Sequence, residues 1–151
     1  MNGVIPDEAH PKTELYDHKA QTWNATWANY DSHSGIRNFQ ILPYLNGFII
    51  FGGCTKSCTK GDSHRTIAKF DPDLNKWTKI GQLNRNRNKF GIIDVHGTFL
   101  VVGGKGGYSK TEKCEITGEK IKCKERLPSF TDWYGYPAMM IAPQDGSCKI
   151  K

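Results

Sequence analysis

The feature that most constrains the fold is a repeated segment in which a strand, turn and strand end in two glycines. The segment QILPYLNGFIIFGG ends at Gly52-Gly53, and GIIDVHGTFLVVGG ends at Gly103-Gly104, 51 residues later. A third segment, MMIAPQDGSCKIK, has the same pattern without a glycine pair. A period of about 50 residues fits a unit of four short strands joined by turns.

A second repeated landmark is an aromatic residue followed by aspartate, with a tryptophan seven residues after the aromatic. Tyr16 and Trp23 form one such pair, and Phe70 and Trp77 form another, 54 residues further along the chain. Side chains of this size fill the space between adjacent twisted sheets, so we expect all of them to pack in the core.

The third copy departs from this pattern after Gly103-Gly104, because no aromatic pair follows. We expect Ile116 and Cys123 to take the aromatic and tryptophan positions there. The glycine pairs themselves are expected where the backbone turns sharply beside neighbouring strands and a Cβ atom would obstruct it.

These landmarks together resemble kelch repeats, whose four-stranded blades form β-propellers. They are a strand that ends in Gly-Gly, an aromatic–aspartate pair, and a tryptophan seven residues after the aromatic. The resemblance covers nearly the whole chain. It implies that Arg37 and Arg87, which lie 15 and 16 residues before the glycine pairs, are residues that pack the blades.

The expected fold is therefore all-β, a segment of a kelch-type propeller, and the 16 glycines and seven prolines agree with short strands and turns. The expected segments are an extended or disordered amino end (1–12), a partial blade (13–27), two whole blades (39–80 and 89–127) and a partial blade (136–151). A closed ring needs roughly four to eight blades. The first interpretation is thus a piece of a longer protein, and the second is self-association of two chains into a six-bladed ring.

The five cysteines predict two disulfides. A two-residue turn in CEITGEKIKC would set Cys114 directly opposite Cys123, in a pair close enough to bond. Cys54 and Cys58 flank a three-residue spacer that could close a second bond, and Cys148 is left over.

The cysteine pairs favour an oxidising, extracellular setting. Asn24 begins an Asn-Ala-Thr triplet, which is an acceptor sequence for N-glycosylation. The amino end lacks the charged and apolar regions of a signal peptide, so a cytosolic location is the alternative.

In a scaffold of this kind the loops carry function. The polar insertion 54–65 is the first candidate for contact with a protein partner, and the basic connection 84–89 is the second; both are equally compatible with plain solvated connections. The candidate contact residues in the insertion are Lys56, Lys60, Asp62, His64 and Arg65.

Other chemistry is disfavoured, and we expect no cofactor. Cys54, Cys58 and His64 could supply three zinc ligands, but no fourth is evident. Residues 105–111 resemble a phosphate-binding loop, yet a hairpin pattern follows them in place of a helix. No nucleophile with its base and no carboxylate pair stands out, so no catalytic residue is assigned.

Partners other than protein are also disfavoured. The net charge of +6 is spread thinly along the chain, which argues against nucleic acid. No run approaches the roughly 18–20 apolar residues of a membrane span. The leading hypothesis is a non-catalytic protein-binding scaffold from a larger protein; the alternatives are a cytosolic adaptor that presents substrates to a ligase, and a propeller enzyme with its active site on the loop face.

Overall fold

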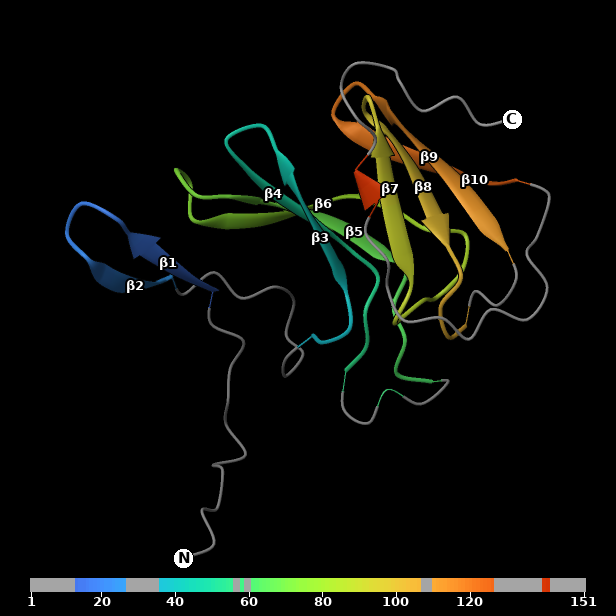
Figure 1. Cartoon of the computed structure of the whole chain (residues 1–151), viewed down its shortest axis with the longest axis horizontal. Helices are drawn as coiled ribbons and strands as arrows, with labels where there is room; N and C mark the ends of the chain where they lie inside the picture. Colours follow the sequence, from blue (N-terminus) through green and yellow to red (C-terminus); the bar gives the residue numbers. More distant parts are fainter. Residues whose placement is uncertain are drawn as a thin grey trace, which may run out of the picture.

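The computed structural model describes residues 13–26, 36–55, 58, 61–106, 110–126 and 140–141. Every element in these ranges is a strand or a turn, so the fold is all-β, as predicted. The strands form a two-stranded sheet and a nine-stranded sheet in the order β11-β7-β8-β9-β10-β6-β5-β4-β3 (Figure 1). The expected segments 1–12 and most of 136–151 lie outside the described residues.

The first four-stranded unit is a run of consecutive antiparallel strands. Its sequence is rich in Ile and Phe, which suit a pleated surface that is buried on its inner face. A β-bulge between Ile67 and Ala68 interrupts the third pairing. The strands are β3 (Gln40–Tyr44), β4 (Gly47–Phe51), β5 (Thr66–Asp71) and β6 (Lys76–Gln82).

The second unit repeats this arrangement. Its first hairpin turns at His96 and Gly97, whose φ angles of 51° and 79° are both left-handed, as the twist of a two-residue hairpin requires. Its last hairpin turns at residues 118–119, as predicted. The strands are β7 (Gly91–Val95), β8 (Thr98–Val102), β9 (Thr111–Thr117) and β10 (Lys120–Arg126).

The two units meet along their last strands, because β10 runs parallel to β6 with Ile121 opposite Gly81 and Lys122 opposite Gln82. A Cβ atom on Gly81 would lie 2.4 Å from the carbonyl oxygen of Ile121, so glycine permits this close approach. At the other edge, the short strand β11 (Met140–Ile141) pairs in parallel with β7.

Both units contribute to one hydrophobic core. The rings of Phe51 from β4 and Phe99 from β8 lie 5.3 Å apart in an edge contact, which joins the two inner surfaces. The buried members of the core are Leu42, Ile49, Phe51, Ile67, Ile80, Leu83, Phe90, Ile92, Phe99, Val101, Cys114 and Ile121.

The remaining hairpin, β1 (Thr13–Asp17) and β2 (Thr22–Thr26), forms a sheet of its own. Tyr16 lies opposite Trp23, just as Phe70 lies opposite Trp77. Tyr16 and Trp23 are nevertheless 47% and 67% exposed. The expectation that this pair is buried is therefore wrong, because among the described residues no further strand pairs with the hairpin and covers it.

The other aromatic pair does pack in the sheet. Phe70 is fully buried, and Trp77 is half-buried with its ring 5.1 Å from that of Phe70 and 5.4 Å from that of Phe48.

The register corrects the assignment of the third copy. Phe48 pairs with Phe70 in the first unit, and Phe99 pairs with Cys114 at the same place in the second. Cys114 therefore takes the aromatic position and Cys123, opposite it, takes the tryptophan position. Ile116, which we expected at the aromatic position, is 40% exposed and lies two residues further along the strand.

Both residues of each glycine pair have left-handed φ angles, between 54° and 100°. At Gly104 a Cβ atom would lie 2.5 Å from the Cβ of Phe90 and 2.8 Å from the carbonyl oxygen of Asn88. Steric crowding and backbone conformation therefore both require glycine there.

We expect Gly104→Ala to lower the free energy of unfolding by roughly 2 kcal/mol or more, because it adds a clash to a strained backbone. Urea denaturation measures the loss. Gly61→Ala is the matched control, since a Cβ atom at Gly61 meets nothing within 4 Å. Equal stability of the two variants would contradict the assigned role of the glycine pair.

Candidate functional site

The long connections gather at one end of the two units (Figure 1). These are the β4–β5 loop, the β6–β7 connection, the β8–β9 loop and the segment that leads into β3. Tight turns occupy the opposite end. We call the end with the long connections the loop face.

Backbone hydrogen bonds fix the base of the β4–β5 loop, which is the predicted contact loop. The amide of Gly53 donates to the carbonyl oxygen of Arg87 at 2.8 Å, and the amide of Arg87 donates to that of His64 at 2.9 Å. Ser63 is buried and its hydroxyl accepts a 2.6 Å hydrogen bond from the side chain of Asn88. The base of the loop is therefore part of the packed structure.

The predicted contact residues of this loop are not equally accessible. Arg65 is exposed, whereas Asp62 and His64 are partly buried. The His64 ring nitrogen Nε2 lies 3.4 Å from the hydroxyl of Thr55, within the loop itself. Lys56 and Lys60 lie outside the described residues.

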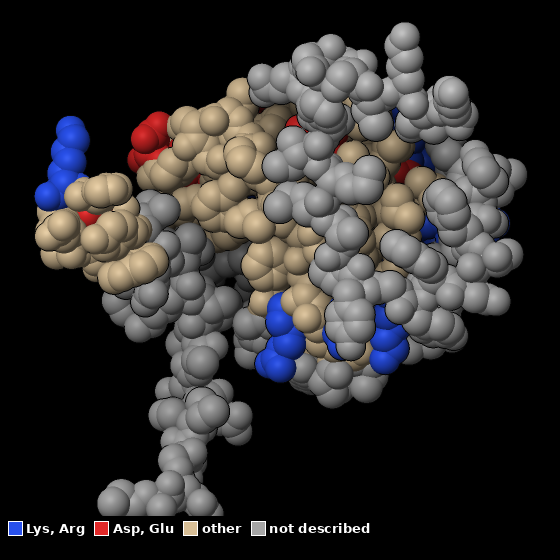
Figure 2. All heavy atoms as spheres, viewed as in Figure 1, with Lys and Arg blue, Asp and Glu red and all other residues tan. Residues whose placement is uncertain are grey.

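Three exposed basic residues from distant segments meet on the loop face, and we call them the basic patch: Arg37, Lys89 and Lys105. The amide of Lys89 donates to the carbonyl oxygen of Asn38 at 3.1 Å, which places Lys89 beside Arg37. Lys105 pairs with Asn88, the neighbour of Lys89. Figure 2 shows Lys and Arg side chains gathered at this end. The basic connection 84–89 predicted one part of this patch from the sequence. That Arg37 and Lys105 lie near Lys89 could be seen only in the folded structure.

Beneath the patch lies a buried ion pair between Arg87 and Glu112, whose side chains are both fully buried. Arg87 Nε lies 3.0 Å from Glu112 Oε1. The other guanidinium nitrogens of Arg87 each donate a 2.6 Å hydrogen bond, one to the carbonyl oxygen of Gly103 and one to that of Lys110. Burial lowers the pKa of Arg87, and the charge of Glu112 partly offsets this effect.

The carboxylate of Glu112 is also fully satisfied. It accepts hydrogen bonds from the backbone and side-chain nitrogens of Asn84 at 2.6 and 3.1 Å, and from the amide of Arg85 at 3.3 Å. The ion pair therefore ties the β6–β7 connection to β9 and to both ends of the β8–β9 loop.

The structure corrects the equivalence of Arg37 and Arg87. Arg37 pairs with Cys54, and Asn88 pairs with Lys105, in each case across 17 residues. Arg37 therefore corresponds to Asn88, and Arg87 corresponds to Ile36. Arg37 is exposed, so the packing role that we expected for both arginines is seen only for Arg87.

The position of Glu112, the partner of Arg87, is also occupied by an apolar residue in the first unit. Glu112 lies two residues before Cys114, and Ala68 lies two residues before the equivalent Phe70. The first unit thus has Ile36 and Ala68 where the second has a buried ion pair.

We expect Arg87→Ile alone or Glu112→Ala alone to lower the free energy of unfolding by about 3–5 kcal/mol, because each leaves an unpaired buried charge. The double variant, which copies the residues of the first unit, should lose less than the sum of the two. Urea denaturation of all four proteins gives the coupling. Additive losses would contradict a direct interaction.

Four of the five cysteines form two disulfide bonds. Cys114 and Cys123 have Cα atoms 4.0 Å apart and an S–S distance of 2.06 Å, while Cys54 and Cys58 have corresponding distances of 5.1 and 1.98 Å. Cys148 lies outside the described residues. Asn24 is on β2, but its side chain is also outside the description.

Neither group of possible metal ligands is arranged for a metal. The Cys54–Cys58 bond removes two of the three ligands proposed with His64. Ligand atoms of Glu112, Cys114 and Cys123 lie within 4.8 Å of one another, yet the two sulfurs are bonded and the carboxylate is held by Arg87. Free thiolates would be required for zinc.

We expect thiol labelling before reduction to modify one of the five cysteines, because the structure pairs four of them. Intact mass after expression through a secretory route measures this number. Cys114→Ser is the control and should leave two thiols open to labelling, those of Cys123 and Cys148. Five labelled thiols in the unsubstituted chain would contradict both bonds.

The sequence resembles curated proteins of one kind. It is 29% identical over 119 residues to kelch-like protein 9 of Mus musculus and to kelch-like protein 13 of Bos taurus and of Homo sapiens. The alignments cover 76% of this chain but only 19% of kelch-like protein 9 and 18% of kelch-like protein 13. No family model matches the sequence.

The solved structure of YjhT has a similar fold, with a TM-score of 0.65 over 78% of this chain and 43% of that one. The sequence identity is 12%, so this likeness bears on the fold alone. Together with the strand order, it defines the chain as a β-propeller segment. The repeat pattern and the kelch-like relatives make the chain similar to kelch-repeat proteins.

The described residues contain no helix with the length and hydropathy that a membrane span requires.

Proposed function

We propose that this chain is a non-catalytic scaffold that binds a protein partner through its loop face. The observation that carries the proposal is the basic patch, in which Arg37, Lys89 and Lys105 are exposed while the backbone beneath them is fixed. Side chains presented on a rigid base lose little entropy when they bind, and this favours recognition. The partner surface should be acidic, because complementary charge steers association and selects partners.

The kelch-like relatives support an interaction role, since repeat scaffolds generally present loops to protein partners. The chain spans less than a fifth of the relatives' length, so the proposal concerns this segment and not a whole protein. The two cysteine pairs support an extracellular setting. The similarity to kelch-like proteins supports the alternative, a cytosolic adaptor. The labelling experiment above separates the two.

We expect Arg37→Gln with Lys105→Gln to weaken partner capture about tenfold, because two charges leave the basic patch. The 151-residue chain serves as bait, and captured proteins are quantified by mass spectrometry against each variant. Lys19→Gln with Lys76→Gln is the matched control, since both lysines are exposed and lie on β-turns or strand ends away from the patch.

The comparison of the two double variants decides the proposal. Proteins that are lost with the patch variant and kept with the control support binding at the loop face. Equal loss with both variants would show that net charge alone attracts the captured proteins and would contradict the proposal.

A further inference from the structure

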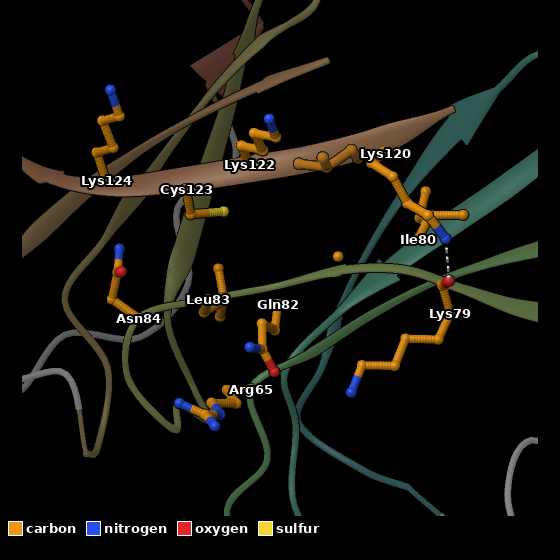
Figure 3. Close-up of a pocket in the computed structure, with 12 residues that line it drawn as sticks. Arg65, Lys79, Ile80, Gln82, Leu83, Asn84, Lys120, Lys122, Cys123 and Lys124 are labelled. Carbon is orange, nitrogen blue, oxygen red and sulfur yellow. Dashed lines mark hydrogen bonds between the residues drawn. The ribbon is translucent and has the colours of Figure 1, made fainter. Parts of the chain in front are cut away.

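A groove of about 640 Å³ lies between β6 and β10, where the two units meet (Figure 3). Its floor is formed by Ile80, Leu83 and Ile121, which are all buried. Among the described residues, no acidic side chain lines it. The basic residues that line it are Arg65, Lys79, Lys120, Lys122 and Lys124.

Three of these lysines, Lys120, Lys122 and Lys124, occupy alternate positions of β10, and we call them the lysine row. Alternate residues of a strand share one face, with a spacing of about 6.6 Å. All three are exposed. In Figure 3, Lys122 and Lys124 extend from the side of β10 that faces away from Leu83, whereas Cys123 projects into the space between β10 and β6.

The charges of the row are only partly balanced by the described part of the chain: Glu115 lies opposite Lys122 on β9 but forms its ion pair with Lys113. Lys120 donates a 3.4 Å hydrogen bond to the carbonyl oxygen of Lys79, which leaves its charge in place. Lys122 and Lys124 form no ion pair with a described acidic residue. The nearest acidic residue along the strand, Glu125, is paired with Arg85 at 2.6 Å.

The row is also held in position. Cys123 lies between Lys122 and Lys124 and is bonded to the buried Cys114 on β9. On its other edge β10 pairs with β6, where Lys122 lies opposite Gln82. A charged row fixed from both sides needs little reorganisation to bind a ligand with matching charges.

We propose that the outward face of β10, along the rim of the groove, binds an extended acidic peptide whose Asp or Glu side chains occur at alternate positions and contact Lys122 and Lys124. Such a peptide repeats its acidic groups every ~6.6–7 Å, which matches the lysine row. Single-stranded nucleic acid is the less suitable ligand, because it is usually bound by stacking on aromatic side chains and none of the lining residues that the structure describes is aromatic. The surface is separate from the basic patch, whose residues do not line the groove.

The test uses the 151-residue chain and a synthetic peptide with glutamate at every second position and glycine between. A second peptide has the same composition with its glutamates grouped in one block. We expect tighter binding of the alternating peptide, and a loss of about tenfold in Lys122→Gln with Lys124→Gln, by fluorescence anisotropy at low salt. Lys19→Gln with Lys76→Gln removes the same charge elsewhere and should bind as the unsubstituted chain does.

Other results would overturn the proposal. They are absence of binding, equal affinity for the two peptides, an equal loss in the two double variants, and tighter binding of an oligothymidylate or of heparin with the same number of charges. Because the basic patch is intact in the Lys122→Gln and Lys124→Gln variant, partner capture at the loop face remains measurable whatever the outcome.

Discussion

The buried guanidinium of Arg87 is the point on which the second unit and the loop face depend. It contacts Glu112 on β9 and the carbonyl oxygens of Gly103 and Lys110, so it closes the β8–β9 loop from both ends. Glu112 in turn accepts hydrogen bonds from the β6–β7 connection. Two buried charges are tolerated because every polar group of the network has a partner. Lys89 and Lys105 of the basic patch are presented from the chain segments that this network holds.

The two units share a backbone arrangement but fill equivalent positions with different chemistry. Ile36 and Ala68 in the first correspond to Arg87 and Glu112 in the second. Phe70 and Trp77 likewise correspond to the bonded pair Cys114 and Cys123. Strand register is set by turns and by the buried face, so it survives such exchanges of side chains. The repeat is therefore a property of the backbone, and local chemistry is free to vary within it.

Much of the fold could be read from the sequence, because its signals are local. Glycine pairs, hairpin turns and alternating apolar residues predicted the strands and the all-β class, and counting outward from one turn set Cys114 opposite Cys123, as in the structure. The sequence did not predict features that depend on contacts between distant parts of the chain. Counting back from the glycine pairs matched Arg37 with Arg87. The bridges Arg37–Cys54 and Asn88–Lys105 show that this match is wrong by one residue.

The candidate sites show the same limit. The exposure of Tyr16 and Trp23 depends on which strands cover them, and no local pattern reports that. The groove exists because β10 runs beside β6, a parallel pairing between residues about 40 positions apart that turn chemistry cannot specify.

The replacement of an aromatic pair by a disulfide makes the two units unequal in one further respect. Phe70 and Trp77 contribute the same packing in any redox environment, whereas the bond between Cys114 and Cys123 exists only where oxidation is maintained. A reducing environment would thus remove the cross-link between β9 and β10 in the second unit. In the first unit it would open only the Cys54–Cys58 bond of the β4–β5 loop, while the packing of Phe70 against Trp77 between the strands stays in place. The compartment therefore changes the strand-to-strand packing of the second unit and not that of the first.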